Sequence, residues 1–167
     1  LVRLGVKAAD DPIVRDSLAV VDRELAYDTP LGRFWHRFTF DGYGETLDGG
    51  PWAVDLPADS RLTRGRGWPL FNGERGEYLI ALGDLAGARD QLATMTAAAS
   101  ASAMLAEQVW DDQAPSGQPG FAPGTSTTSA TPLLWSHAQY VRLAAGVAAG
   151  AVVEQPPAVA CRYLGRC

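Results

Sequence analysis

Alanine-rich segments with helical spacing constrain the fold of this chain more than any other feature. The 167 residues include 27 alanines, which cluster in stretches where apolar side chains recur every three or four positions. The alternation of β-branched and polar residues that is typical of half-buried strands is almost absent. We therefore expect an all-α fold.

The first helix has a clear start signal. Asp11 can cap it while Pro12 takes the first helical position, where a missing N–H costs nothing. We expect this helix to end near Tyr27. Steps of four, three and four residues place its apolar side chains on one face, namely Val14, Leu18, Val21 and Leu25.

Three further helices are predicted downstream. The second should run from about Pro69 to Leu82, because Gly83 can supply the left-handed residue that closes it. Asp84 should cap the third, and the short joint implies that these two helices pack as an antiparallel hairpin. A fourth should start at Thr131–Pro132. We expect irregular structure after residue 153.

Two connections between these helices are much longer than usual, at residues 28–67 and 111–130. Long ordered loops in small domains commonly carry function. Ten of the fifteen aromatic residues fall between Tyr27 and Tyr78, so the first connection is rich in rings. The loops are therefore where we expect a site, although single rings can equally pack the loop onto the helices.

Charge and hydropathy argue against several partners. The net charge is −5 and the chain has no run of Lys and Arg, so we expect no nucleic acid partner. The longest apolar stretch is Leu143–Val153, about half of the ~20 residues that a bilayer span requires. We expect no membrane partner either.

Metal and cofactor motifs are not found. Cys161 and Cys167 can form neither a disulfide framework nor a four-ligand zinc site. His36 and His137 are distant in sequence, and His137 fits a helix face, which favours a structural role. No phosphate-binding loop or nucleophile elbow is present. We expect no metal and no cofactor.

The residue types in the first long loop suit a carbohydrate. Arg37, Asp41, Tyr43 and Glu45 lie among aromatic rings, and sugar sites combine ring faces with carboxylates and arginine. A surface loop with an ordinary Arg–Asp ion pair would give the same composition. A second candidate is Glu107, which lies just past the third helix, where an apolar run gives way to polar residues.

Taken in order, five motifs resemble the C-terminal half of a bacterial family 15 glycoside hydrolase, of the glucoamylase and glucodextranase group. They are residues 37–45 (RFTFDGYGE), 51–52 (PW), 67–70 with 73–76 (GWPL, GERG), 107–111 (EQVWD) and 130–137 (ATPLLWSH). The resemblance implies an (α/α)6 toroid, of which four or five helices with long active-site loops lie here. Residues 1–167 would then be the C-terminal portion of a catalytic domain, with an N-terminal half preceding Leu1 as its partner.

The resemblance also implies a mechanism and a set of site residues. Family members invert configuration, with one carboxylic acid and one carboxylate that activates water. Glu107 is similar to the general base, and the general acid would lie in the absent half. Arg37 and Asp41 resemble the pair that grips the terminal glucose. Neighbours of the same pocket are Tyr43, Trp68, Trp110 and Trp135, with Glu45 and Trp52 beside them.

The leading hypothesis is thus an inverting, exo-acting α-glucoside hydrolase that releases glucose from the non-reducing ends of α-glucans or oligosaccharides. This chain would supply the base but not the acid. The alternative is a non-catalytic α-helical fragment that binds carbohydrate or another protein through the same aromatic residues.

Overall fold

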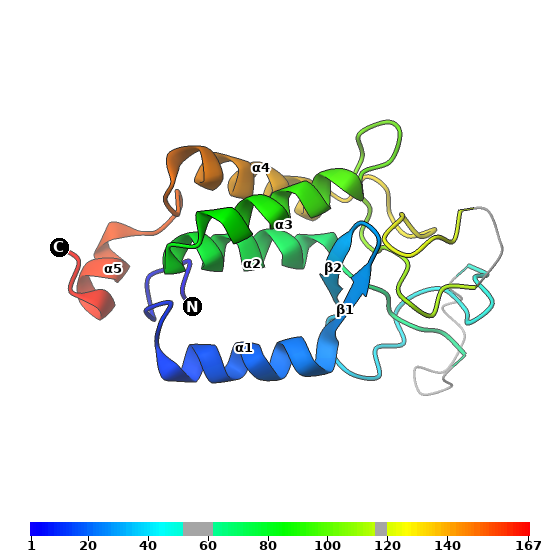
Figure 1. Cartoon of the computed structure of the whole chain (residues 1–167), viewed down its shortest axis with the longest axis horizontal. Helices are drawn as coiled ribbons and strands as arrows, with labels where there is room; N and C mark the ends of the chain where they lie inside the picture. Colours follow the sequence, from blue (N-terminus) through cyan, green and yellow to red (C-terminus); the bar gives the residue numbers. More distant parts are fainter. Residues whose placement is uncertain (52–61, 116–119) are drawn as a thin grey trace.

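The secondary structure is mostly helical, as predicted. The computed structural model describes residues 1–51, 62–115 and 120–167, and these ranges contain five helices and one two-stranded sheet (Figure 1). The elements are α1 (Pro12–Leu25), β1 (Ala26–Thr29), β2 (Gly32–Trp35), α2 (Pro69–Leu82), α3 (Leu85–Ala97), α4 (Leu134–Ala149) and α5 (Pro157–Leu164). Among the helices in these ranges, none has the length and apolar character needed to cross a bilayer.

The predicted capping signals act at the expected places. The Asp11 carboxylate accepts a hydrogen bond of 2.9 Å from the backbone N–H of Ile13 at the start of α1. Gly83 closes α2 with a φ of 90°. The Asp84 carboxylate then accepts from the N–H of Gly87, and α3 returns along α2 as the predicted hairpin.

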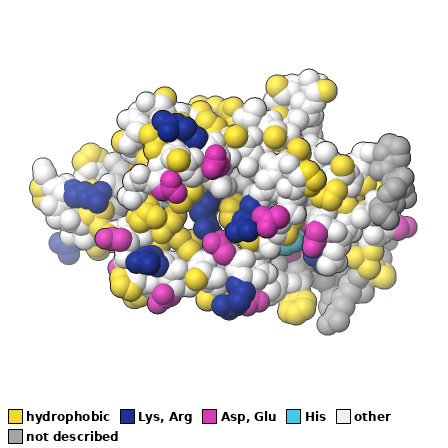
Figure 2. Space-filling model, in the orientation of Figure 1, with side chains coloured by type: hydrophobic (Ala, Val, Ile, Leu, Met, Phe, Trp, Pro, Cys, Tyr) yellow, Lys and Arg dark blue, Asp and Glu magenta, His cyan; other side chains and the backbone are white. Residues whose placement is uncertain are grey.

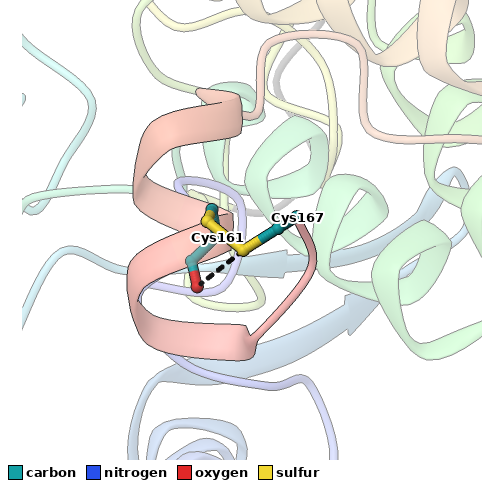
Figure 3. Close-up of a disulfide and its surroundings, with 2 residues drawn as sticks. All are labelled: Cys161 and Cys167. Carbon is teal, nitrogen blue, oxygen red and sulfur yellow. Dashed lines mark hydrogen bonds between the residues drawn. A yellow bond between two sulfur atoms is a disulfide. The ribbon is translucent and has the colours of Figure 1, made fainter.

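Two local predictions were wrong, and the pairing of the cysteines was not predicted. α4 begins at Leu134 and not at Thr131–Pro132, because Leu133 is extended and its N–H donates to the carbonyl of Leu105. α5 occupies a region expected to be irregular, with proline in its first turn and Gly165 in the left-handed conformation at its end. The two cysteines, to which no role was assigned, form a disulfide between α5 and the last residue (Figure 3).

The β1–β2 hairpin was also not predicted. Its strands are only four residues long, with Ala26 opposite Trp35 and Thr29 opposite Gly32. The hairpin turns the chain at the end of α1 and buries Tyr27 and Phe34 against the loops. It therefore joins the helices to the ring-rich connection.

α2 packs against both α3 and α4. The core beside it contains Ile80, Ala88, Met95, Leu105 and Leu143. α2 and α4 pack closely because α2 has glycine where they meet: a Cβ on Gly76 would lie 2.5 Å from Cδ1 of Leu143. Such close packing leaves no room for an added methyl group unless a neighbour moves.

α1 lies apart from the other helices (Figure 1), and none of its residues is buried by the described part of the chain. Its four predicted apolar residues line one side of a hollow of about 530 Å³, whose other side includes Phe71 and Tyr78 of α2. Figure 2 shows this hollow between α1 and the helical body, with hydrophobic and charged side chains around it. The four apolar residues thus lie on one face of α1, as predicted, but the described residues do not cover that face.

The packing of α2 against α4 yields a stability prediction. Alanine is intrinsically a better helix former than glycine by about 1 kcal/mol, yet Gly76→Ala should destabilise the protein by about 1–3 kcal/mol through overpacking. Urea unfolding measures the difference. Ala81→Gly at a half-buried position of the same helix is the control for propensity alone. An increase in stability for Gly76→Ala would contradict the close approach of the two helices.

Candidate active site

The segment 105–111 carries Glu107 across the loop end of the helical body. It is held on both sides by backbone hydrogen bonds. Val109 exchanges two with Gly67, at 2.8 and 3.2 Å, and the N–H of Glu107 donates to the carbonyl of Ala130 at 2.9 Å. The 107–111 motif therefore lies between two other loop segments, which fix its backbone although it belongs to no long sheet.

Two side chains at the start of α4 fix the residues just before Glu107. His137 accepts a hydrogen bond from the N–H of Leu105 through Nε2, at 3.0 Å. The hydroxyl of Ser136 is buried and donates to the carbonyl of Ala106, also at 3.0 Å. These contacts agree with the structural role predicted for His137 and attach the start of α4 to residues 105–106.

Gln108 ties three segments together next to Glu107. Its Oε1 accepts from the N–H of Arg66 at 2.6 Å, and its Nε2 donates to the carbonyl of Tyr43 at 2.8 Å. Its own N–H donates to the hydroxyl of Ser129 at 3.0 Å. Because Gln108 is only 1% exposed, water competes little for these bonds.

The carboxyl group of Glu107 is half-buried and meets two of the predicted sugar-binding residues. Burial raises its pKa above the ordinary value, and the negative charge of Glu45 adds to this. A hydrogen bond from Tyr43, the charge of Arg37 and a hydrogen bond from Gln108 act in the opposite direction and lower the pKa. The net result is a raised pKa, which makes Glu107 a stronger proton acceptor than a solvated glutamate.

Arg37 and Asp41 form a two-pronged ion pair, as the sequence suggested. Arg37 Nε lies 2.7 Å from one oxygen of Asp41 and Nη2 lies 2.8 Å from the other. The Arg37 guanidinium carbon is 4.8 Å from the ring centre of Tyr43 and 4.9 Å from that of Trp68. Within the described ranges, Nη1 of Arg37 has no acceptor, so its N–H groups can donate to a ligand.

The predicted rings are placed differently from one another. Trp68 is 4% exposed, with its ring 6.3 Å from that of Tyr43, so both belong to the cluster around Arg37. Trp135 is at the start of α4 and 57% exposed, which leaves its ring accessible. Trp52 lies outside the residues that the structure describes.

Trp110 does not present a ring face to the site. It is 1% exposed, and its ring lies 4.7 Å from that of Phe121 and 5.0 Å from the guanidinium carbon of Arg66. Further chain packed on this region could only bury it more. Trp110 is therefore enclosed by side chains that pack around residues 107–111.

A buried ion cluster beneath the site was missed by the sequence analysis. Asp111, whose side chain is fully buried, contacts Nε of Arg64 and Nη1 of the fully buried Arg66, both at 2.6 Å. Burial alone would raise the pKa of Asp111, but the two arginines outweigh it and the pKa is lowered. In the sequence, the two arginines lie in one loop and the aspartate lies in another. A local pattern cannot show that residues so far apart in sequence are in contact.

The described ranges contain no group of three His, Cys, Asp or Glu residues that could hold a metal ion. The groups that this arrangement presents are carboxylates, arginines and aromatic rings. An accessible carboxylate with a raised pKa lies beside a cation and two aromatic rings. This combination suits proton transfer next to a bound neutral, hydroxyl-rich molecule.

The buried cluster predicts a large stability difference between two Asp→Asn substitutions. Asp111→Asn should cost about 3 kcal/mol, because it leaves a buried arginine without a charged partner. Asp28→Asn removes an ion pair to Arg33 that is mostly exposed, and should cost less than about 1 kcal/mol. Urea unfolding at neutral pH compares the two variants, and equal losses would contradict the cluster.

The pH dependence of this difference has a defined sign. The folded-state pKa of Asp111 is lowered, so its contribution is complete above the ordinary Asp pKa of about 3.9 and is lost as the pH falls through the folded value. The difference in the free energy of unfolding between wild type and Asp111→Asn, measured by urea unfolding, should therefore become smaller at acidic pH.

Comparisons with known proteins identify the family of this chain. The family model for glycosyl hydrolases family 15 matches residues 1–145. A glucoamylase from Clostridium sp. (strain G0005) is 39% identical over 170 residues, which cover 99% of this chain and 21% of that protein. The crystal structure of a bacterial glucoamylase complexed with acarbose superposes with a TM-score of 0.84 at 40% identity, over 98% of this chain and 22% of that one.

A more distant structure, a wild-type glycosidase, matches 84% of this chain and 32% of its own at 29% identity, with a TM-score of 0.55. The chain thus spans about a fifth to a third of the length of these relatives. The match to glucoamylase, whose fold is an (α/α)6 toroid, fits the helical architecture found here. The family model covers most of the chain, and the chain belongs to glycosyl hydrolases family 15.

Proposed function

We propose that this chain carries the general-base half of an inverting, exo-acting α-glucoside hydrolase, with Glu107 as the base. The observation that carries the proposal is the half-buried Glu107 carboxylate, whose pKa is raised and which is hydrogen-bonded to Tyr43 beside Arg37. A base must accept a proton at the working pH, and a raised pKa increases its proton affinity. Family membership and the names of the relatives support an α-glucan substrate.

In this mechanism Glu107 removes a proton from the water that attacks the anomeric carbon. The water's oxygen forms a bond to that carbon while the glycosidic bond breaks, and a carboxylic acid on the other face protonates the leaving oxygen. The two carboxyl groups must be about 6.5–9.5 Å apart to leave room for the water. Tyr43 lies beside Glu107 and, as a hydrogen-bond donor, favours the ionised carboxylate.

Arg37 and Asp41 are proposed to bind hydroxyl groups of the terminal sugar. Asp41 fixes the guanidinium plane through two hydrogen bonds, while the N–H groups on Nη1 remain to donate. Tyr43 and Trp68 flank the same guanidinium, and the exposed ring of Trp135 can cover an apolar sugar face. The ion pair is internally neutral, which suits an uncharged substrate.

We further propose that residues 1–167 form the C-terminal portion of a larger toroidal domain that also supplies the acid. Two observations support this proposal. The chain matches about a fifth of the length of the two glucoamylases, and the apolar face of α1 lines a hollow that the described residues leave open. Further helices of the same domain would cover that face.

Replacing Glu107 by Gln tests the base directly. In the complete enzyme that contains this chain, Glu107→Gln should lower kcat on maltooligosaccharides by about 10²–10⁴-fold, because general-base catalysis contributes that much. Binding of the same sugar, followed by tryptophan fluorescence, should change little, since Arg37, Asp41 and the rings remain.

The matched control is Glu24→Gln, which removes an exposed carboxylate on α1 that pairs with its neighbour Arg23. It should leave kcat and KM unchanged. Near-wild-type turnover in Glu107→Gln would end the base assignment. Sugar binding without hydrolysis in the unmodified complete protein would favour the non-catalytic alternative.

The pH profile gives a second test of the same residue. A base must be ionised, so kcat/KM should fall as the pH falls through the pKa of Glu107, and this limb should lie above the usual Glu value of about 4.3. Tyr43→Phe removes a hydrogen bond that favours the ionised form, so the acidic limb should move to higher pH. A limb that stays in place or moves to lower pH would contradict the contact between the two side chains.

A further inference from the structure

Glu45 is buried at the end of the loop that carries the predicted sugar-binding residues, and it is only 2% exposed. Its Oε1 accepts two hydrogen bonds from Thr128, one from the backbone N–H at 2.7 Å and one from the hydroxyl at 2.8 Å. Its backbone carbonyl accepts from the N–H of Arg64 at 2.9 Å. Glu45 thus joins three segments that are distant in sequence.

Thr128 belongs to the segment 125–130, which runs beside Glu107. Trp110 donates its N–H to the carbonyl of Thr125 at 2.9 Å, and Thr127 donates its N–H to the carbonyl of Gln108 at 3.1 Å. With the bond from Glu107 to Ala130, these contacts attach the segment to residues 107–110. Glu45 binds the same segment through Thr128, so the segment connects Glu45 to residues 107–110.

The second oxygen of Glu45 has no partner among the described residues, although it is buried. A buried carboxylate oxygen without a hydrogen bond is costly, and such groups in folded proteins call for an explanation. The charge of Glu45 acts on Glu107: burial and Glu45 raise the pKa of Glu107, while Tyr43, Arg37 and Gln108 lower it. A structural clamp alone would not require this charge, because a neutral glutamine also offers an acceptor to Thr128.

We propose that Glu45 is a positioning residue for the base, which fixes the 125–130 segment through Thr128 and keeps a second negative charge beside Glu107. The proposal rests on the assignment of Glu107 as base. Glu45 does not touch the reacting atoms. It fixes the segment that holds the backbone of Glu107. It also sets the pH below which Glu107 is protonated and can no longer act as a base.

Glu45→Gln separates the charge from the clamp. The amide oxygen can still accept from Thr128, while the negative charge is lost. In the complete enzyme, the acidic limb of the kcat/KM profile should move to lower pH by about half a unit, because a like charge no longer opposes ionisation of Glu107. KM on a maltooligosaccharide should stay the same, and Glu24→Gln should leave the limb in place.

Thr128→Val separates the clamp from the charge. It removes the hydroxyl donor to Glu45 and leaves both carboxylates, so kcat should fall severalfold while the acidic limb stays where it is. This variant also keeps the proposal testable if Glu45→Gln does not fold. Unchanged kcat and KM in Thr128→Val would overturn the positioning role.

Glu107→Gln, measured in parallel, distinguishes the two ways in which the proposal can fail. If Glu107→Gln is inactive but Glu45→Gln has the wild-type pH profile, the role of Glu45 is overturned and the base assignment survives. If Glu107→Gln keeps wild-type turnover, the base assignment fails and the role of Glu45 fails with it.

Discussion

The buried carboxylate of Asp111 holds the loop end of the molecule together. Taking a carboxylate and a guanidinium out of water costs several kcal/mol for each ion, and only close pairing offsets that cost. Asp111 meets the requirement with two arginines at 2.6 Å, and Arg66 also stacks on the buried ring of Trp110. Because Arg64 and Arg66 come just before Gly67, which pairs with Val109, the ion cluster sets which loop lies next to residues 107–111.

The hydrogen bonds around Glu107 depend on that pairing. Gly67 pairs with Val109 at a position where a Cβ would clash with the hydroxyl and the ring of Tyr27, so only glycine fits there without a shift. The Gln108 side chain then reaches both Arg66 and Tyr43, which brings the loop that contains Arg37 and Asp41 close to Glu107. Polar groups in a shielded region interact more strongly than in water, so these hydrogen bonds together favour one arrangement of the loops.

Sequence reasoning predicted the parts of this structure that local chemistry decides. Asp11, Gly83 and Asp84 act through neighbours within four residues, so the ends of three helices could be predicted from single side chains. The Arg37–Asp41 pair spans four residues and was anticipated for the same reason.

Contacts between distant segments were not predictable in the same way. Asp111 and Arg66 are 45 residues apart, and no local pattern connects them. The burial of Trp110 depends on that cluster, so the sequence alone could not show that its ring is enclosed. The start of α4 was misplaced because Leu133 pairs with Leu105, a tertiary contact that overrides a proline start signal.

The two ends of the molecule differ in how much further structure they require. Within the described ranges, the backbone of residues 105–111 is fixed by hydrogen bonds from the loops, from Tyr27 of β1 and from the start of α4. The surroundings of Glu107 are therefore organised by residues of this chain. α1, in contrast, lines an open hollow with its apolar stripe, and exposed apolar area is unfavourable in water. If further helices of a toroid cover α1, that apolar area becomes buried, and the loops around Glu107 need little reordering because their hydrogen bonds are already made within this chain.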